Sequence, residues 1–477
     1  MAASLLAVPF FIGYLGVEGY GLIGFGTAVQ SLLVLLDLGL APTISRQIAR
    51  ASEADQRNRA RNLLKSMASI YWGVALCIGV GLTFAAHFIA TDWLNIGRLP
   101  PNEVTVGLIL LGIQLAVRWP GSLYIGALTG GRHLVLSSVL STGYITLANV
   151  GAIAVLAWLP RIEAFFLWQA AIGLLYTLAL QRAAWAKLGG SSGAHFDVAE
   201  LKNIWRFSAQ MSGIALISIL ITQLDKVILS KTTTLTEFAH YMLATLAISS
   251  LYRITAPLFN AIYPRFSALV MQEETDKLAK VYRLGSNLFA GFWFSGIMFT
   301  VLCAPALLTL WTGDTVLAVQ TAPLMSLLAL GTGLHGMMFF PYALQLAYGE
   351  AQLTLKIHLL LLAIQLPLIL ILALNMGALG GAIACFVLYL VYMIIGTTLT
   401  HRRLLIGLGA RWLFFDLGRP LIVSALFGCL GMLILRGLVL GTVAQVAVGL
   451  VLASLAALTS TALSPYRIDE IKAVLAD

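Results

Sequence analysis

Long apolar segments dominate the pattern of hydrophobic and polar residues along this chain. A helix needs about 20 apolar residues to cross the hydrocarbon core of a bilayer, and most of these segments reach that length. Lipid offers a backbone no hydrogen-bond partners, and the segments are too long and too uniformly apolar for barrel strands, so they are predicted to be helices. The predicted spans are residues 1–14 (a short one), 20–46, 67–89, 104–128, 134–158, 163–186, 204–229, 238–262, 285–309, 321–347, 352–374, 377–400, 415–436 and 440–462. The pattern therefore predicts an all-α polytopic membrane protein with about 14 transmembrane helices.

The overall composition agrees with this prediction. Of the 477 residues, 60% are hydrophobic and 10% are charged, whereas a soluble domain carries roughly 25% charged residues. The net charge of +9 does not indicate a nucleic-acid partner, because the basic residues lie in short loops between apolar segments. The four cysteines are scattered through apolar segments with no metal-ligand or CxxC spacing, and neither a metal nor a cofactor is predicted.

Lysine and arginine residues gather in alternate loops. About 22 of the 29 lie on one side of the predicted membrane, nine of them in the charged loops 47–66 and 263–284, and about 4 lie on the other. The positive-inside rule makes the basic side cytoplasmic, so both termini are predicted to be cytoplasmic. The N-terminus lacks the features of a signal peptide, and the short first span is either shortened or begins upstream. No loop is long enough for a separate soluble domain.

The chain shows an internal repeat with an offset near 220 residues. Pro120 and Pro341 lie near the ends of corresponding spans, and the charged loops 47–66 and 263–284 correspond as well. One unit holds six spans, an even number, so both copies have the same orientation, and such parallel repeats favour alternating access around a central cleft. The predicted lobes are residues 1–190 and 191–405, followed by two extra helices and a cytoplasmic tail in 406–477.

Several segments carry a family resemblance. Leu15 to Ala49 (LGVEGYGLIGFGTAVQSLLVLLDLGLAPTISRQIA) resembles the opening signature of Wzx-type polysaccharide flippases, in the multidrug/oligosaccharidyl-lipid/polysaccharide (MOP) superfamily. Supporting similarities lie at Trp205 to Ser208, Gln223 to Lys231, Ala239 to Tyr241, Ile262 to Arg265 and Met376 to Ala384.

That resemblance implies a fold like that of multidrug and toxic compound extrusion (MATE) transporters, with two six-helix lobes around a V-shaped cavity. The implied substrate is an undecaprenyl-diphosphate-linked oligosaccharide destined for O-antigen or exopolysaccharide in the bacterial inner membrane. Polysaccharide assembly proteins are the implied partners. Translocation breaks no bond, so the protein is predicted not to be an enzyme.

Two arginines stand out because charge at the bilayer centre costs roughly 2.5–3.5 kcal/mol on insertion scales. Arg118 lies near the middle of the fourth span and Arg253 near the middle of the eighth, one in each predicted lobe. The planar guanidinium binds two phosphate oxygens at once, so both are predicted to face the cavity and bind the diphosphate or the glycan. The alternative is a structural ion pair in which Asp37 neutralises Arg253.

Other charged residues are secondary candidates. Arg46, at a helix end, is predicted either to fix orientation or to capture the diphosphate at the inner mouth. Asp225 and Lys226 are adjacent and, pointing about 100° apart, are expected to need different partners, as anchors or as a gate. Asp37 and Asp225 are the candidates for coupling transport to H⁺ or Na⁺.

Two further features have a structural interpretation. His335, in the tenth span, is interpreted as a buried and satisfied imidazole, with a proton relay as the alternative. The glycines at 21, 24, 26, 377, 380 and 381 are predicted to allow close helix packing rather than phosphate binding.

Three other functions compete with this hypothesis. A multidrug antiporter of the same superfamily would favour acidic residues for organic cations, whereas the mid-membrane charges here are mostly basic. A lipid II flippase shares the layout of 14 spans and the basic cavity. A membrane glycan polymerase or ligase, from a different class, usually carries a large outward loop with catalytic Arg or His, and the outward loops here are short.

Overall fold

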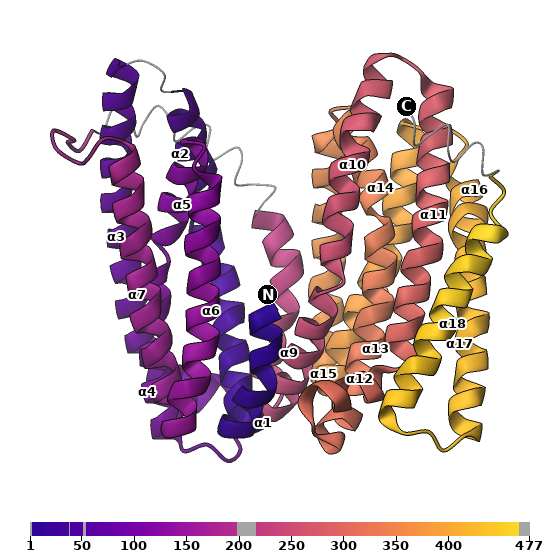
Figure 1. Ribbon diagram of the computed structural model, residues 1–477, viewed down its shortest axis with the longest axis horizontal. Coiled ribbons are helices and arrows are strands. Elements are labelled where there is room, and N and C mark those ends of the chain that lie inside the picture. Colours follow the sequence, from indigo (N-terminus) through magenta and orange to yellow (C-terminus); the bar gives the residue numbers. More distant parts are fainter. Residues whose placement is uncertain (1, 38, 51–53, 198–215, 467–477) are drawn as a thin grey trace. The chain divides into compact units, whose positions relative to one another are not determined.

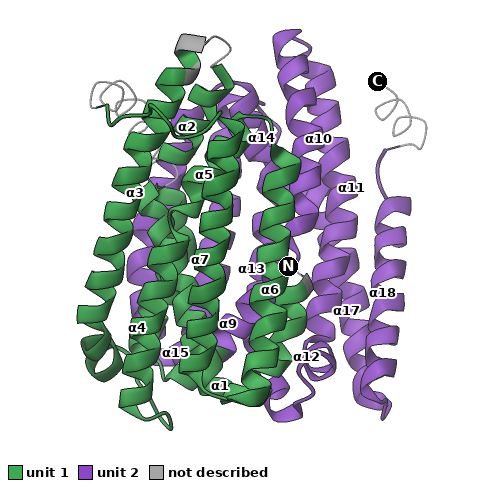
Figure 2. Ribbon diagram, turned by 60° about the vertical axis from the view of Figure 1, so that its left-hand side comes forward, with its two compact units in different colours: residues 1–239 green, residues 240–477 purple. Residues whose placement is uncertain are grey.

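The computed structural model describes residues 2–37, 39–50, 54–197 and 216–466, and the chain divides into two compact units, residues 1–239 (unit 1) and 240–477 (unit 2) (Figures 1 and 2). The described residues are almost entirely helical, with a single β-bridge between Asn95 and Thr234. Unit 1 contains α1 (Ala2–Leu33), α2 (Leu40–Arg50), α3 (Ala54–Phe88), α4 (Pro101–Arg118), α5 (Gly121–Gly130), α6 (Leu134–Trp158), α7 (Ile162–Lys187), the helical residues 216–232 and the start of α9 (Leu235–Ser249). Unit 2 contains the rest of α9 and α10 (Tyr252–Met271), α11 (Thr275–Leu302), α12 (Ala304–Thr312), α13 (Thr315–Met337), α14 (Phe339–Ala347), α15 (Ala351–Arg403), α16 (Gly409–Arg411), α17 (Gly418–Gly437) and α18 (Thr442–Ala462).

The predicted all-α, polytopic fold is confirmed. Within the described ranges, 11 helical segments are long and apolar enough to cross a membrane. Two of them, in α1 and α15, are pairs of helices merged across a kink at Gly16 (φ 75°) and at Gly377 (φ 57°), where the sequence predicted boundaries between spans. The helical residues 216–232 belong to the predicted span 204–229, whose first part, with the Trp205 to Ser208 motif, lies outside the described residues.

The chain reverses direction at Gly377. A Cβ atom added at Gly380 would lie 1.9 Å from the carbonyl oxygen of Leu372, although residues eight positions apart in a straight helix are about 12 Å apart. Gly377 itself has φ 57° and ψ −136°, a region that only glycine occupies without strain. The small residues of this motif therefore make a tight turn between two helices, as the sequence predicted for close packing.

Replacing Gly380 by alanine is expected to destabilise the protein by about 1–3 kcal/mol, because the added methyl group overlaps the Leu372 carbonyl and the turn must open. Gly143, on α6, is the matched control, since an added Cβ there meets no atom within 4 Å. Thermal unfolding of both variants in the same detergent measures the difference. Equal unfolding temperatures for the two variants would contradict the tight turn.

Several predicted spans are broken in the structure. The span 20–46 ends in a short 3-10 turn, Val34–Asp37, and resumes as the separate helix α2, so its prediction as one helix was wrong. Pro42 lies in the first turn of α2, where a missing N–H costs nothing, and Gly39 (φ 69°) precedes it. Similar breaks separate α4 from α5, α9 from α10, α11 from α12 and α13 from α14.

The charged segments predicted as loops are shorter in the structure. In the predicted loop 47–66, α2 continues to Arg50 and α3 begins at Ala54. In 263–284, α10 extends to Met271 and α11 begins at Thr275. Helices that extend beyond the hydrocarbon core keep their own backbone hydrogen bonds and expose charged side chains to water, so the end of the apolar segment does not mark the end of the helix.

Both units contain the repeat. The helix α3 begins at residue 54 and α11 at 275, an offset of 221; α5 begins at 121 and α14 at 339, an offset of 218. The offsets agree with the value near 220 found in the sequence. The predicted lobe boundaries at 190 and 405 stay a prediction, because compactness places residues 216–232 in unit 1 without showing which helices move together.

A buried carboxylate of α1 binds the loop before α4 in unit 1. Glu18, within the opening signature, is 8% exposed and accepts backbone N–H groups from Gly97, Arg98 (2.8 Å) and Leu99 (3.2 Å). Close by in the chain, a Cβ atom on Gly21 would lie 2.5 Å from the carbonyl oxygen of Leu235. Part of the segment Leu15 to Ala49 is thus explained by packing and by hydrogen bonds to the loop before α4, which confirms the structural interpretation of Gly21.

The last two helices pack on α11. An added Cβ on Gly431 of α17 would lie 2.5 Å from Leu302, and one on Gly449 of α18 would lie 2.2 Å from Cys303 Sγ. At the other end of α11, Arg283 donates to the buried carboxylate of Asp416 through Nε (2.7 Å) and Nη2 (3.2 Å). Small residues and one ion pair therefore attach α17 and α18 to unit 2.

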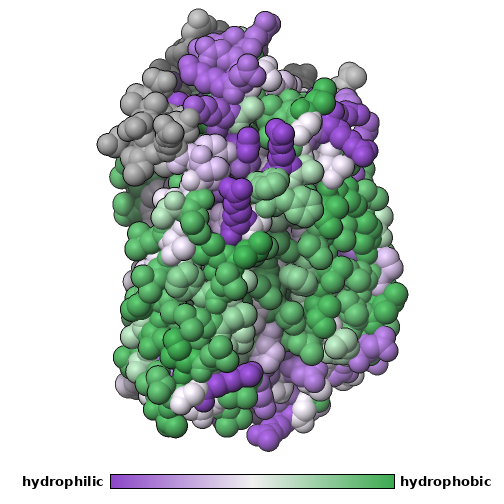
Figure 3. All heavy atoms as spheres, turned by 90° about the vertical axis from the view of Figure 1, so that its right-hand side faces the viewer, coloured by the Kyte–Doolittle hydropathy of each residue, from purple (hydrophilic) through white to green (hydrophobic). Residues whose placement is uncertain are grey.

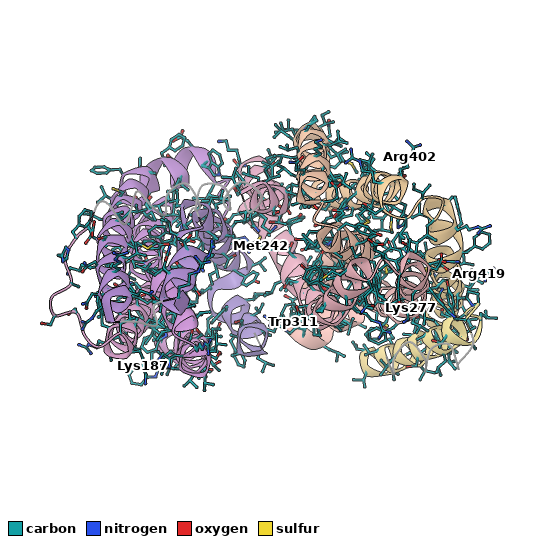
Figure 4. The ribbon with its side chains drawn as sticks, turned by 90° about the horizontal axis from the view of Figure 1, so that it is seen from above. Lys187, Met242, Lys277, Trp311, Arg402 and Arg419 are labelled. Carbon is teal, nitrogen blue, oxygen red and sulfur yellow. The ribbon has the colours of Figure 1, made fainter. Side chains whose placement is uncertain are left out.

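The surface of unit 2 shows an apolar band. Figure 3 displays hydrophobic side chains over most of the face formed by α17 and α18, with hydrophilic residues gathered mainly toward one end. Exposed apolar side chains of these two helices include Leu426, Leu433, Val451 and Leu458. In the view along the helices, Arg402 and Arg419 lie at the periphery of unit 2 (Figure 4). This distribution is that of a multi-pass membrane protein, and which end faces the cytoplasm stays a prediction.

Candidate functional site

Arg118 lies at a break inside a membrane span. It is the last residue of α4, and the helical segment continues through Trp119 and Pro120 into α5. Pro120 has no N–H to donate, which explains the local break. Arg118 and Gly130 are 12 positions apart, about 18 Å along a helix at about 1.5 Å per residue, so the guanidinium is in the interior of the span.

Two side chains from other helices hold the Arg118 guanidinium. Its Nη1 donates a hydrogen bond of 2.8 Å to Oε1 of Gln30 on α1. Its central carbon lies 4.9 Å from the centroid of the Tyr144 ring on α6, and that ring stacks on Tyr176 of α7 at 4.5 Å. Among the described residues no carboxylate lies within 4.0 Å of Arg118, so a neutral amide and an aromatic face orient the cation without neutralising it.

Arg118 lines a cavity of ≈ 340 Å³ within unit 1. The Ser141 hydroxyl and the Tyr176 hydroxyl, 2.8 Å apart, add a polar edge to it. A cation, an amide, hydroxyl groups and aromatic rings in one cavity suit a ligand that carries both negative charge and sugar-like polarity. The lining residues are Gln30, Leu33, Val34, Leu115, Arg118, Trp119, Gly121, Ser122, Ile125, Ser141, Tyr144, Ile145 and Tyr176.

Asp37 lies beside the same cavity but does not pair with Arg118. Its Oδ1 accepts hydrogen bonds from the Tyr71 hydroxyl and, at 3.3 Å, from Ser122 Oγ, which lines the cavity. Its Oδ2 accepts from the backbone N–H of Ala41 at 3.3 Å, which places the carboxylate at the start of α2. Asp37 therefore ties the break after α1 to α3 and α5. Its predicted roles in ion coupling, and as a partner of Arg253, stay predictions.

Arg46 does not line the Arg118 cavity. It lies on the exposed side of α2, whose opposite side buries Thr43, Ile44 and Ile48. The contact with α5 is very close, since a Cβ added at Gly130 would lie 2.2 Å from the carbonyl oxygen of Ser45. The helix α2 is therefore amphipathic, and capture of a diphosphate by Arg46 stays a prediction.

Arg253 belongs to unit 2 and is exposed. It is the second residue of α10 and lies 18 positions from each end of the span Leu235–Met271, at its centre. Its neighbour Tyr252 packs edge-to-face against His335 at 5.5 Å between ring centroids. An exposed arginine at mid-span requires water or a partner. Its role in a cavity stays a prediction.

Asp225 and Lys226 interact with each other. Lys226 Nζ lies 3.1 Å from Asp225 Oδ1 and donates to the Thr222 carbonyl oxygen at 2.7 Å. They were expected to need different partners, yet they contact each other, because the long lysine side chain curls back along the helix. Each also has a further interaction, which for Lys226 is the Thr222 carbonyl oxygen. Asp225 is 5% exposed, and its predicted coupling and gating roles stay predictions.

Sequence reasoning missed the partners of Arg118. Gln30, Tyr144 and Tyr176 were not among the candidates, although each is a polar or amphipathic residue inside a predicted span. The available signal was that location, since polar groups inside a span tend to face protein or water. What joins the three residues is the packing of α1, α6 and α7 around the end of α4, which the linear pattern does not contain.

Comparisons with known protein sequences give two matches. A protein family described as "Polysaccharide biosynthesis protein" matches residues 1–270. A Shigella flexneri protein named "Putative O-antigen transporter" is 22% identical over 393 residues, which are 80% of this chain and 90% of that protein.

Two solved structures show the same fold. An inward-facing multidrug resistance MATE family transporter of the MOP superfamily has a TM-score of 0.71 at 15% identity and covers 84% of this chain and 94% of its own. The lipid II flippase MurJ in an inward closed conformation has a TM-score of 0.71 at 11% identity and covers 97% of this chain and 96% of its own.

Proposed function

Because the chain belongs to the polysaccharide biosynthesis protein family, we propose that it is a flippase for an undecaprenyl-diphosphate-linked oligosaccharide in the bacterial cytoplasmic membrane. The chain is a membrane transporter of the polysaccharide type and not an enzyme, as the sequence predicted. Beyond this role, the proposal specifies the lipid that carries the oligosaccharide, a cationic site that binds it, and the cytoplasmic membrane as the location. It also retains both termini in the cytoplasm and polysaccharide assembly proteins as partners.

The observation that carries the proposal is the setting of Arg118. The guanidinium lies inside a span and within a cavity, and among the described residues no carboxylate is within salt-bridge distance of it. Such an arrangement is costly unless the guanidinium meets an anion during function. A diphosphate supplies two adjacent anionic groups that match the fork of N–H donors. The Tyr144–Tyr176 pair and the Ser141 hydroxyl offer surfaces on which sugar rings can pack and form hydrogen bonds.

The extra helices favour a lipid-linked substrate over a drug. The similarity to MurJ covers 97% of the chain and so extends over α17 and α18, whereas the MATE transporter covers 84%. A drug antiporter would also favour an acidic group open to organic cations, but the Asp37 carboxylate accepts hydrogen bonds from Tyr71, Ser122 and Ala41. These features support a substrate whose polar head crosses while its tail stays in lipid.

A reconstituted translocation assay tests the proposal. Purified full-length protein is placed in liposomes with a fluorescent undecaprenyl-diphosphate oligosaccharide, and a membrane-impermeant quencher reports the fraction of probe on the outer leaflet over time. Faster crossing than in protein-free liposomes is expected. A lipid II analogue and a cationic dye serve as competing substrates in parallel samples. Extrusion of the dye under an ion gradient, without crossing of the oligosaccharide probe, would assign the protein to the drug-antiporter class instead.

A further inference from the structure

Two histidines lie close together inside unit 2, at a joint in a membrane span. His335 lies three residues before Met338, where α13 ends and α14 is about to begin, and His358 lies near the start of α15. Both rings contact the same side chain, since each imidazole centroid lies 5.9 Å from the centroid of the Tyr392 ring. Neither belongs to the Arg118 cavity, and the functional proposal above does not use them.

From the sequence, His335 was interpreted as an imidazole with its hydrogen bonds satisfied. In the described part of the structure, both His335 and His358 have a ring nitrogen without a hydrogen-bond partner. Nδ1 of His335 and Nδ1 of His358 are both buried and have no hydrogen-bond partner among the described residues. By contrast, Nδ1 of the buried His240 lies 2.9 Å from the Thr321 hydroxyl. A buried polar atom without a partner is uncommon and calls for an explanation, such as a role in which an ion or a proton arrives.

Aromatic rings surround the two histidines. His335 lies between Tyr389 (4.7 Å between centroids), Tyr252 (5.5 Å) and Tyr392 (5.9 Å). The Tyr392 ring also contacts His358 at 5.9 Å, so it connects the two imidazoles. The negative faces of aromatic rings attract a cation, so this enclosure offers a protonated imidazole some compensation for its burial.

Four helices pack around His335, and the side chains that each brings near it are as follows. Tyr252 approaches from α10, next to the exposed Arg253. The helix α15 contributes Tyr389, Tyr392 and His358. Two helices approach with aromatic residues that do not ionise: α14 with Phe339 (5.8 Å) and α11 with Trp293, whose Nε1 donates to the Gly333 carbonyl oxygen at 2.9 Å. The helix α12 joins α13 at its other end, through the turn at Gly313.

We propose that His335 and His358 form a proton-binding site that holds one proton between them. The nitrogen lone pair of one neutral imidazole takes a proton from water on one side of the membrane and returns it to water on the other. Two imidazolium ions packed against the same tyrosine ring would repel each other, so the pair accepts one proton rather than two.

The site is placed to couple proton binding to a change of shape. The Met338 N–H donates to the His335 carbonyl oxygen at 2.9 Å, and Pro341 in the first turn of α14 has no N–H to continue the regular helical pattern. A charge that appears beside this joint changes which bend of the α13–α14 span is favoured. This coupling rests on the proposed transport function, whereas proton binding itself does not.

The first experiment measures protonation directly. Full-length protein labelled with ¹⁵N-histidine, in nanodiscs, is studied by nuclear magnetic resonance between about pH 4 and pH 8, a window that extends below the range in which exposed imidazoles titrate. The seven histidine signals are assigned by single substitutions whose folding is checked by thermal unfolding. One of the pair is expected to become protonated while the other stays neutral, and H335Q or H358Q is expected to change the titration of the remaining partner. Two imidazoles that stay neutral throughout, or that protonate independently, would overturn the proposal.

The second experiment asks whether that proton is used. Liposomes containing the fluorescent undecaprenyl-diphosphate oligosaccharide are given a pH gradient, and crossing is compared with and without it. H335Q and H358Q are each expected to lose the stimulation by the gradient, and the double variant to lose no more than either single one. H240Q, in which a hydrogen-bonded buried histidine is changed, is the matched control and is expected to keep it. Retained stimulation in H335Q and H358Q would overturn the coupling. Absence of crossing under any gradient would overturn the flippase assignment. Proton binding would still be decided by the magnetic resonance titration.

Discussion

Replacement of Arg118 by alanine is expected to abolish translocation of the lipid-linked oligosaccharide while expression and thermal stability stay close to those of the unmodified protein. The guanidinium has no carboxylate partner within 4.0 Å among the described residues, so its removal leaves no buried charge behind. The change removes one hydrogen bond to Gln30, worth about 0.5–1.5 kcal/mol, and the contact of the guanidinium with the Tyr144 ring. Crossing in liposomes and thermal unfolding in detergent are measured on the same preparation.

Two further variants separate charge from geometry. R118K keeps the positive charge but loses the planar fork and the stacking on Tyr144, so it is expected to retain part of the activity. Q30E places a carboxylate where the 2.8 Å hydrogen bond to Arg118 now lies, and the resulting ion pair competes with an anionic substrate. Q30E is therefore expected to lose crossing without loss of stability, and Q30M, which removes the hydrogen bond without adding charge, is its matched control.

The pattern of results is decisive for the cationic site. Normal crossing by R118A would exclude Arg118 from the transport route and leave it as a packing residue. Equal loss in Q30E and Q30M would show that the lost hydrogen bond to the guanidinium, and not the added negative charge, is the cause. Loss in R118A and Q30E, with retention in Q30M, is the combination expected for a binding site that needs an uncompensated cation.

The spans were predictable because membrane insertion is decided by local sequence. An apolar segment of sufficient length must be helical and must cross wherever it occurs, so the predicted spans recur in the structure. The breaks inside spans are different, because a turn after Leu33 or at Met338 hardly changes hydropathy. Pro42, Pro120 and Pro341 mark three of these joints, and each lies where a missing N–H is tolerated.

The central residue of the site was predictable, but its surroundings were not. Arg118 stood out because a charge in mid-span is costly wherever it lies. Its partners Gln30 and Tyr144 come from helices that are far apart in sequence, and their meeting depends on which faces of α1, α4 and α6 pack together. The Asp225–Lys226 contact was not predicted for another reason. The direction in which a residue leaves the helix does not fix where the end of a side chain as flexible as lysine lies.

Replacement of Arg283 by alanine is expected to destabilise the attachment of the last two helices by about 3–5 kcal/mol, the range for breaking a buried ion pair. Asp416 is completely buried, and its carboxylate accepts two hydrogen bonds from Arg283 and one of 3.0 Å from the Tyr466 hydroxyl. Without the guanidinium, one tyrosine hydroxyl is the remaining donor described for a buried negative charge. Thermal unfolding in detergent measures the loss.

The two partners are not equivalent, and the difference tests the explanation. Replacement of Asp416 by alanine leaves Arg283, whose side chain is 30% exposed, free to turn toward water, so D416A is expected to cost less than R283A. The double variant leaves neither charge buried and is expected to be more stable than R283A alone. If R283A and D416A were equally destabilising, or if their effects added, the buried carboxylate would not be the source of the loss.

Cysteine labelling locates the damage. Cys303 is buried against α18, where an added Cβ on Gly449 would lie 2.2 Å from its sulfur atom, and its Sγ lies 3.6 Å from the Gln445 carbonyl oxygen. In a protein whose other cysteines are replaced, R283A is expected to increase maleimide labelling of Cys303, because release at the Asp416 end loosens α17 and α18 along α11. Lower thermal stability with unchanged labelling would place the damage in the core of unit 2 around α11 rather than at the α17–α18 attachment. Crossing in liposomes, measured on the same R283A preparation, then shows whether translocation depends on the attachment of α17 and α18.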